Sequence, residues 1–105
     1  MTVPSDREVK FRQMAAQFPD APLAHFSLGK VLLEERRFAE AAGSLARATH
    51  LDAHFAAAWV SLGDAHAGAG QSEGARSAWS QARALALAQG HPELAEEIDE
   101  RIAEL

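Results

Sequence analysis

The fold is decided by residues 22–55, PLAHFSLGKVLLEERRFAEAAGSLARATHLDAHF, and by residues 56–89, AAAWVSLGDAHAGAGQSEGARSAWSQARALALAQ, which follow directly. The two segments have equal lengths and align without a gap, so that position 22 falls on position 56 and position 55 on position 89. Seven aligned positions are identical, and in the first segment they are Ala24, Ser27, Leu28, Gly29, Ala41, Ala48 and Leu51. A fixed period of this length indicates a repeat array, which changes the expected fold from a globule to a stack.

This pattern resembles the tetratricopeptide repeat family, whose repeat has the same length, about 34 residues. That family has a large residue at repeat position 4, Leu-Gly at 7–8, a large residue at 11, Ala at 20, an aromatic or Leu at 24, Ala at 27 and Pro at 32. Each copy matches six of these eight positions. The first copy departs at His25 and Ala53, and the second departs at His66 and Leu87. The resemblance implies that the repeat-packing residues are Leu28, Gly29, Leu32, Ala41, Leu45, Ala48, Trp59, Leu62, Gly63, Ala75, Trp79 and Ala82.

Upstream, residues 5–18 resemble the second helix of a repeat whose first helix is missing. Carrying the register back places Phe11 at position 24 and Pro19 at position 32. Ser5 predicts a helix N-cap, and Glu8, three residues later, predicts a capping box. The resemblance implies an all-α, right-handed α-solenoid of antiparallel helix pairs in one domain. Its parts are a half-repeat helix at 5–18, repeat 1 at 22–55, repeat 2 at 56–89 and a capping helix at 92–105, with helices expected at 5–18, 22–35, 38–51, 56–69, 72–89 and 92–104.

Residues 92–105 have no match to the repeat pattern. Leu94, Ile98, Ile102 and Leu105 form one apolar stripe at helical spacing, and acidic residues surround it. A repeat stack leaves its last helix pair exposed, so a helix with a polar outer face is needed to cover it. We expect the stripe to be buried, with the register shifted by two residues so that Leu94 and Ile98 take packing positions 7 and 11.

Composition supports a small helical domain. The chain has 105 residues, 48% hydrophobic and 24% charged, with no cysteine. It is rich in alanine, which favours helix, and it lacks thiolate metal sites and disulfides. Its net charge of −5 is concentrated in the last thirteen residues, and no basic stripe predicts nucleic-acid binding. Without a membrane-length apolar run or a signal-peptide pattern, we expect a cytoplasmic protein. Eight arginines against two lysines, with abundant alanine, suggest a bacterial gene.

In this family the first helix of each repeat lines a concave groove. The corresponding groove residues here are Leu23, Phe26, Ser27, Lys30, Leu33, Glu34, Val60, Ser61 and Asp64, with Ala57, Ala67 and Gly68 at the remaining positions. Such a surface suits an extended or helical peptide with apolar anchors. The opposing interpretation is that the N-terminal helix partly covers Phe26 and Leu33, since single exposed apolar residues are common.

The residues give little support for binding of a terminal carboxylate, for a metal site or for catalysis. Family members that grip a terminal carboxylate use Lys, Asn and Arg at groove positions, and of the matching residues here only Lys30 could serve. His50, Asp52 and His54 lie close together but straddle a helix end, and a metal needs further oriented ligands. We therefore expect no metal and no cofactor. His25 and His66 occupy packing positions, where space-filling with one bonded nitrogen is expected. No catalytic residues are apparent.

Three functions are compared. The first is a non-catalytic protein–protein interaction module, a scaffold or adaptor that binds a peptide or protein segment in its groove. The alternative is a self-assembling structural protein that forms a homodimer through an uncovered terminal helix face, or by exchanging its last helix. An enzyme or metal protein is the third, which the residues do not favour.

Overall fold

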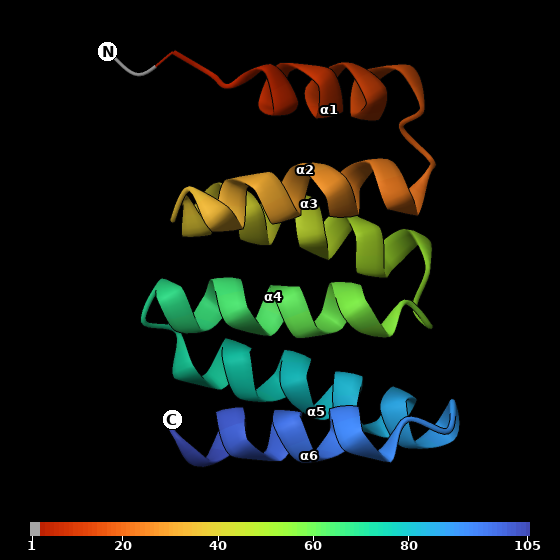
Figure 1. The fold of residues 1–105 in the computed structure, drawn as a ribbon, viewed down its shortest axis with the longest axis vertical. Helices are drawn as coiled ribbons and strands as arrows, with labels where there is room; N and C mark the ends of the chain where they lie inside the picture. The colour runs from red at the N-terminus through yellow and green to blue at the C-terminus, as the bar shows by residue number, and fades with distance from the viewer. Residues whose placement is uncertain (1–2) are drawn as a thin grey trace.

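Residues 3–105 are described by a computed structural model, and they form six α-helices joined by short turns. The helices lie one above the next along the long axis of the molecule (Figure 1). Each end lies within one residue of the range expected from the sequence. The helices are α1 (Asp6–Gln17), α2 (Pro22–Glu34), α3 (Phe38–Leu51), α4 (Ala56–Gly68), α5 (Ser72–Ala88) and α6 (Pro92–Ala103).

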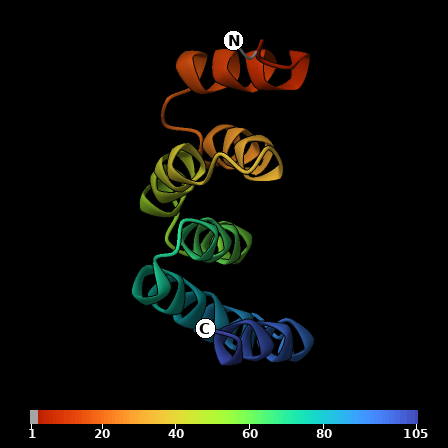
Figure 2. The same ribbon diagram turned by 90° about the vertical axis from the view of Figure 1, so that its left-hand side faces the viewer.

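The helices are arranged as an α-solenoid. Each helix packs chiefly on its neighbours in the chain, and α2 also contacts α4. The result is an elongated body measuring 37 × 27 × 19 Å. Seen from the side, the stack is a crescent (Figure 2). Its outer edge carries α3 and α5, and its inner edge carries α2 and α4, with α1 and α6 at the two ends. We call the side formed by α2 and α4 the inner face.

Tight turns set the directions of the helices. Gly70 and Gly90 have positive φ angles of 76° and 80°, which glycine adopts without steric cost. Arg36 also has a positive φ, 59°, and it aligns with Gly70 at the same place in the repeat. Both repeats thus use a left-handed residue to turn from the first helix into the second. Pro22 and Pro92 begin α2 and α6, where the missing N–H costs no helix hydrogen bond.

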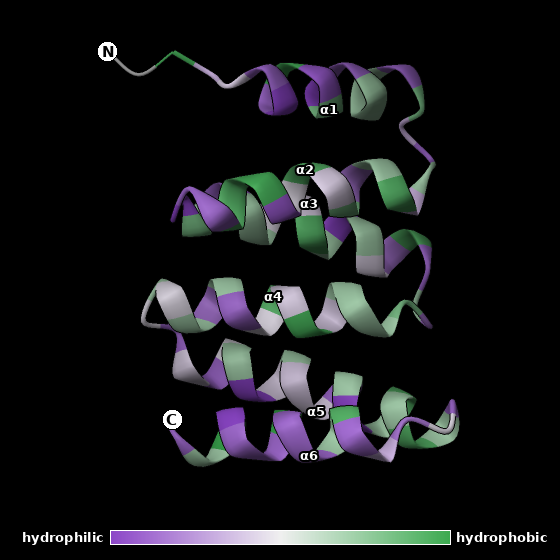
Figure 3. Cartoon of the chain, viewed as in Figure 1, coloured by the Kyte–Doolittle hydropathy of each residue, from purple (hydrophilic) through white to green (hydrophobic). Residues whose placement is uncertain are grey.

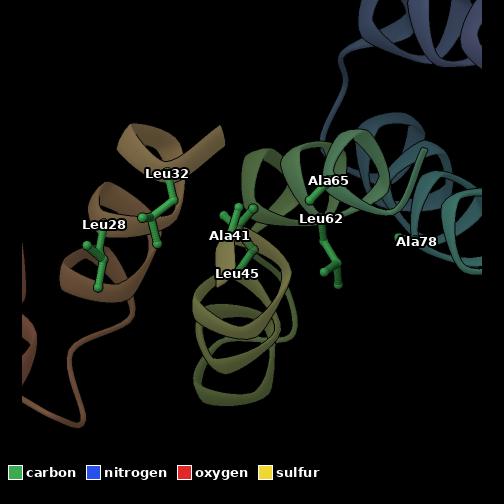
Figure 4. Close-up of a cluster of buried hydrophobic side chains, with 7 residues drawn as sticks. All are labelled: Leu28, Leu32, Ala41, Leu45, Leu62, Ala65 and Ala78. Carbon is green, nitrogen blue, oxygen red and sulfur yellow. The ribbon is translucent and has the colours of Figure 1, made fainter. Parts of the chain in front are cut away.

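The core is a seam of two apolar clusters. In the first cluster, Ala41 and Leu45 of α3 lie between the leucines of α2 and the pair Leu62 and Ala65 of α4 (Figure 4). The second joins Ala75, Trp79 and Ala82 of α5 to Ile98 of α6. Trp59 of α4 is half-buried and packs against both clusters.

Glycines allow the paired helices to approach closely. A Cβ atom on Gly29 would lie 2.5 Å from Cγ of Leu45, and one on Gly63 would overlap the indole of Trp79. These two contacts are equivalent in the two repeats, because each places the position 8 glycine against the large residue at position 24. The close packing leaves Leu45 fully buried and Trp79 only 4% exposed. Among the other repeat-packing residues, Leu28, Leu32, Ala41, Ala48, Leu62, Ala75 and Ala82 are also buried.

The last helix covers the end of the stack, and most of its residues are hydrophilic, which Figure 3 shows in purple. Ile98 is fully buried, and Leu94 and Ile102 are half-buried against the second cluster, as expected from the stripe. Leu105 does not belong to this stripe: it follows the end of α6 and is 39% exposed.

Counting from the helix starts gives a register for α6 that differs from the predicted shift. Helix α4 begins at Ala56, which aligns with Pro22 at the start of α2, whereas α6 begins at Pro92, two positions later than the repeat register would place it. By this count Ile98 corresponds to Leu62 and Ile102 to His66, whereas the predicted shift assigns Leu94 and Ile98 to positions 7 and 11. Helix α6 begins later because α5, with 17 residues, is longer than α3, with 14.

At the other end, α1 is attached by charged groups. The Glu8 side chain accepts hydrogen bonds from Arg12 Nε at 2.8 Å and from Arg37 Nη1 at 2.5 Å. Arg37 precedes α3 and also bonds Glu40 at 2.9 Å. The capping box is only half formed: Ser5 Oγ accepts the Glu8 N–H at 3.1 Å, but the Glu8 carboxylate faces the two arginines instead of the Ser5 backbone. Two hydrogen bonds from guanidinium groups are stronger than the single bond from a backbone N–H that they replace.

This network predicts acid-sensitive attachment of α1. The hydrogen bonds from Arg12 and then Arg37 lower the pKa of Glu8. A carboxyl with a lowered pKa in the folded state stabilises the fold above its unfolded pKa, near 4.5, and that stability is lost as the pH falls through the folded value. We expect the unfolding free energy of Glu8→Gln to fall less with acidification than that of the wild type, measured by urea unfolding between about pH 7 and 3. Exposed Glu73→Gln is the matched control, and equal acid dependence in wild type and Glu8→Gln would contradict the assignment.

Candidate functional site

The groove residues predicted from the sequence belong to α2 and α4, the helices that form the inner face, but they are not equally accessible. Leu23 is 61% exposed. Glu34 is also exposed, and its carboxylate is engaged by Arg7 of α1 at 3.0 Å. The half-buried members are Phe26, Ser27, Lys30, Leu33, Val60 and Asp64. The inner face therefore offers an apolar part on α2 and a polar part around Lys30 and Asp64.

Aromatic packing fixes the apolar part. The rings of Phe26 and Phe55 are 4.7 Å apart between centroids and tilted by 42°. Phe26 and Leu33 also pack on the first core cluster, so the buried side of each ring or chain is held rigidly while the other side remains accessible. Rigid apolar side chains of this kind bind with little loss of conformational entropy.

Ser61 does not belong to the accessible surface. It is only 3% exposed, so a bound segment cannot reach it without a rearrangement. Its counterpart Ser27 is half-buried. The repeat position alone therefore does not decide whether this serine is accessible.

A hollow of about 400 Å³ opens where α4, α5 and α6 meet. Its lining residues are Asp64, Ala67, Trp79, Arg101, Glu104 and Leu105. Trp79 Nε1 donates to the Val60 carbonyl at 3.1 Å and to Asp64 Oδ1 at 3.2 Å. Arg101 Nε lies 3.5 Å from the same carboxylate oxygen. The indole thus connects the core to the polar end of the inner face.

The charges in this hollow are only partly balanced. Burial raises the pKa of Asp64, while Arg101, Trp79 and Lys30 act in the opposite direction. Arg101 Nη1 is shielded from solvent and has no hydrogen-bond partner within residues 3–105. A buried donor without an acceptor is uncommon in folded proteins and calls for an explanation.

The histidines serve local structure. His25 Nε2 bonds the Pro19 carbonyl at 2.8 Å, and His66 Nδ1 bonds Gln71 Oε1 at 2.8 Å. Asp52 Oδ1 accepts the His54 N–H at 3.0 Å after the end of α3. Across residues 3–105, no three His, Asp or Glu side chains come together in a way that could hold a metal ion. In the same range, every helix is too short or too polar to span a bilayer.

Comparison with known proteins identifies the family. The sequence profile of the tetratricopeptide repeat family matches residues 10–53 and 26–92, which together span α1 to α5. The chain belongs to the tetratricopeptide repeat family. Proteins of this family are generally non-catalytic interaction modules. The glycine contacts at Gly29 and Gly63 are thus the structural form of the Leu-Gly pair in the family pattern.

Individual relatives agree with this assignment. A TPR repeat-containing protein of Pseudomonas aeruginosa, PA0015, is 36% identical over 86 residues, covering 82% of each chain. The solution structure of BPP2914 from Bordetella parapertussis is 29% identical, with a TM-score of 0.80, over 97% of this chain and 88% of that one. PcrH, solved in complex with the chaperone-binding region of PopD, has the same fold, with a TM-score of 0.86 and 21% identity, over 92% of this chain and 74% of that one.

The sequence predicted only some of the residues that line the hollow. Asp64 was expected at a groove position, but Arg101, Glu104 and Leu105 were not, because α6 does not follow the repeat pattern. One signal was present in the sequence. Arg101 is the only basic residue among the last thirteen, where six acids surround it. An isolated cation in an acidic helix is a candidate for a specific contact.

Proposed function

We propose that this protein is a non-catalytic interaction module that holds a segment of another protein against its inner face. The observation that carries the proposal is the combination of accessible apolar side chains at Leu23, Phe26 and Leu33 with a polar hollow beyond them, at Asp64. Apolar anchors with a few placed polar groups are the usual composition of a peptide-binding surface.

The fold supports this proposal. A stack of helices presents a long surface to a partner, because each repeat adds a further helix to the same face. PcrH, whose structure contains the chaperone-binding region of PopD, is an example of this fold in a complex with part of another protein. Helices α1 and α6 project at the two ends of the inner face in the side view (Figure 2). An extended or helical segment is therefore the expected form of the partner.

Peptide selection tests the site with a matched pair of variants. Peptides would be selected from a display library on the wild-type chain, and their affinities would be measured for Leu23→Glu and Leu87→Glu. Both leucines are exposed, at 61% and 49%, but Leu23 lies on α2 and Leu87 on the outer helix α5. We expect Leu23→Glu to weaken binding at least about tenfold, since burying an unpaired carboxylate against apolar groups is costly.

Leu87→Glu is expected to leave the selected peptides bound as in the wild type. Equal affinities for both variants would place the binding surface elsewhere. Melting temperatures close to the wild-type value would show that both variants are folded, as expected for substitutions at exposed positions.

The alternative function, a homodimer formed through an uncovered helix face, has weaker support. Val9 of α1 is 43% exposed, and Val3 and Phe18 on either side of the helix are 83% and 53% exposed, while Phe11 and Ala15 pack inward on the first cluster. Three exposed side chains are fewer than the apolar core of an obligate dimer interface contains. Light scattering over a range of concentrations separates the two proposals.

A further inference from the structure

The hollow between α4, α5 and α6 has donors and acceptors that the fold leaves unused. Arg101 directs Nε toward Asp64 at 3.5 Å, but its Nη1 has no acceptor in the described part of the chain. The Arg101 side chain is 38% exposed, so the guanidinium lies at the rim of the hollow and not in the core. Nη1 itself is shielded from solvent, so a bound molecule reaches it only when the Arg101 side chain changes its rotamer.

Acceptors lie beside Arg101. Asp64 receives the Trp79 indole N–H at Oδ1, at 3.2 Å, which leaves most of its acceptor capacity available. Glu104 supplies a second carboxylate, and the remaining walls are apolar, formed by Ala67, the Trp79 ring and Leu105. The hollow therefore combines one guanidinium, two carboxylates and an apolar lining.

This combination discriminates among the side chains of a partner. A carboxylate would meet Asp64 and Glu104, which repel it. An ammonium group would be attracted by the two carboxylates, but Arg101 would repel it, and it has no acceptor to offer to the Arg101 donor. A primary carboxamide carries both a carbonyl acceptor and an NH₂ donor without a net charge, and the methylene groups of its stem suit the apolar walls.

Resting on the proposed function, we propose that the hollow is a subsite for the primary carboxamide of a glutamine or asparagine in the bound segment. The carboxamide oxygen accepts from Arg101 Nη1, and its NH₂ donates to the Asp64 carboxylate. The subsite then fixes the register of a segment whose apolar residues lie on α2. A hydrogen-bonding site of this type gives specificity, because a side chain lacking the matching group leaves buried polar atoms unpaired.

The test is an NMR titration of the full chain with N-acetyl-glutamine N′-methylamide, up to about 50 mM, because a ligand this small binds weakly. The two indole N–H signals provide a reporter and a control. Trp79 lines the hollow, whereas Trp59 Nε1 donates to the Ala53 carbonyl at 3.0 Å and does not line it. We expect saturable shifts of the Trp79 indole and of Arg101 Nε–H, and none at Trp59. The corresponding glutamate and lysine derivatives are expected to bind at least about threefold more weakly.

A matched pair of variants locates the interaction. Arg101→Met removes the donor and keeps the alkyl stem, and it is expected to abolish the Trp79 shift. Arg83→Met removes a similarly exposed arginine, which pairs with Asp99 at 2.6 Å outside the hollow, and it is expected to leave the shift intact. Three results would overturn the subsite: no saturable Trp79 shift, equal or tighter binding of the charged derivatives, or an unchanged shift in Arg101→Met.

The two proposals fail separately. If Leu23→Glu weakens binding of the selected peptides while the glutamine derivative gives no shift, the groove stands and the subsite is wrong. If the glutamine derivative binds in the hollow but Leu23→Glu and Leu87→Glu behave alike, the proposed groove is wrong and only a small-molecule site is left.

Discussion

Replacing Trp79 with alanine is expected to lower the unfolding free energy by about 3–5 kcal/mol, the range for truncation of a large core side chain. Trp79 is 4% exposed and fills the space between α4, α5 and α6. Its truncation removes contacts with Gly63 and Ile98 and leaves a cavity in a narrow seam. Since a domain of this size has little stability to spare, the variant should be largely unfolded at physiological temperature.

Urea unfolding followed by circular dichroism measures this effect. Trp79→Phe is the control that separates packing from hydrogen bonding, because it keeps a ring but removes the indole N–H bonds to Val60 and Asp64. We expect it to retain most of the stability lost in Trp79→Ala. A loss below about 1 kcal/mol for Trp79→Ala would contradict the assignment of this residue to the core, since that is the size of a surface effect.

Gly63→Ala and Gly43→Ala are expected to change stability in opposite directions. A Cβ atom at position 63 would overlap the Trp79 indole, and Trp79 is too tightly packed to move aside. Overpacking of this kind costs about 1–3 kcal/mol. At position 43, inside α3, a Cβ atom would meet no atom within 4 Å. There the higher helix propensity of alanine should stabilise the fold by about 0.5–1 kcal/mol.

Thermal or urea unfolding of both variants checks this pair. Both variants carry the same glycine-to-alanine change. The chemical nature of the substitution therefore cannot account for opposite effects on the free energy of unfolding. Equal gains at both positions would show that α4 and α5 can separate to admit the methyl group. In that case the close approach at Gly63 would not be a requirement of the fold.

Much of the fold could be predicted from the sequence, because repetition carries redundant information. Gly29 and Leu45 recur as Gly63 and Trp79, and each pair makes the same contact. The turn at Arg36 and Gly70 recurs in the same way. The position of α6 is different, since no second copy exists against which to align it. The bounds of α5 and α6 followed from the sequence, but which residues of α6 correspond to the packing positions of α4 did not.

The candidate site was predictable only where it follows the repeat. Leu23, Phe26 and Asp64 were found through their repeat positions, and the structure leaves each at least partly accessible. Ser61 has an equivalent position but is buried, because accessibility depends on the surrounding side chains and not on the repeat position alone. Arg101 depends on how α6 crosses the end of the stack, which is a property of tertiary packing.

The half-buried Trp59 has a consequence for how the chain folds. It contacts the cluster around Leu45 and also the cluster around Trp79. In an array whose units contact only their neighbours, cooperativity is the sum of local couplings. Trp59, together with Leu62, Ala65 and Ala78, therefore links the unfolding of the N-terminal helices to that of the C-terminal helices. The strength of this junction decides whether the chain melts as one unit or as two.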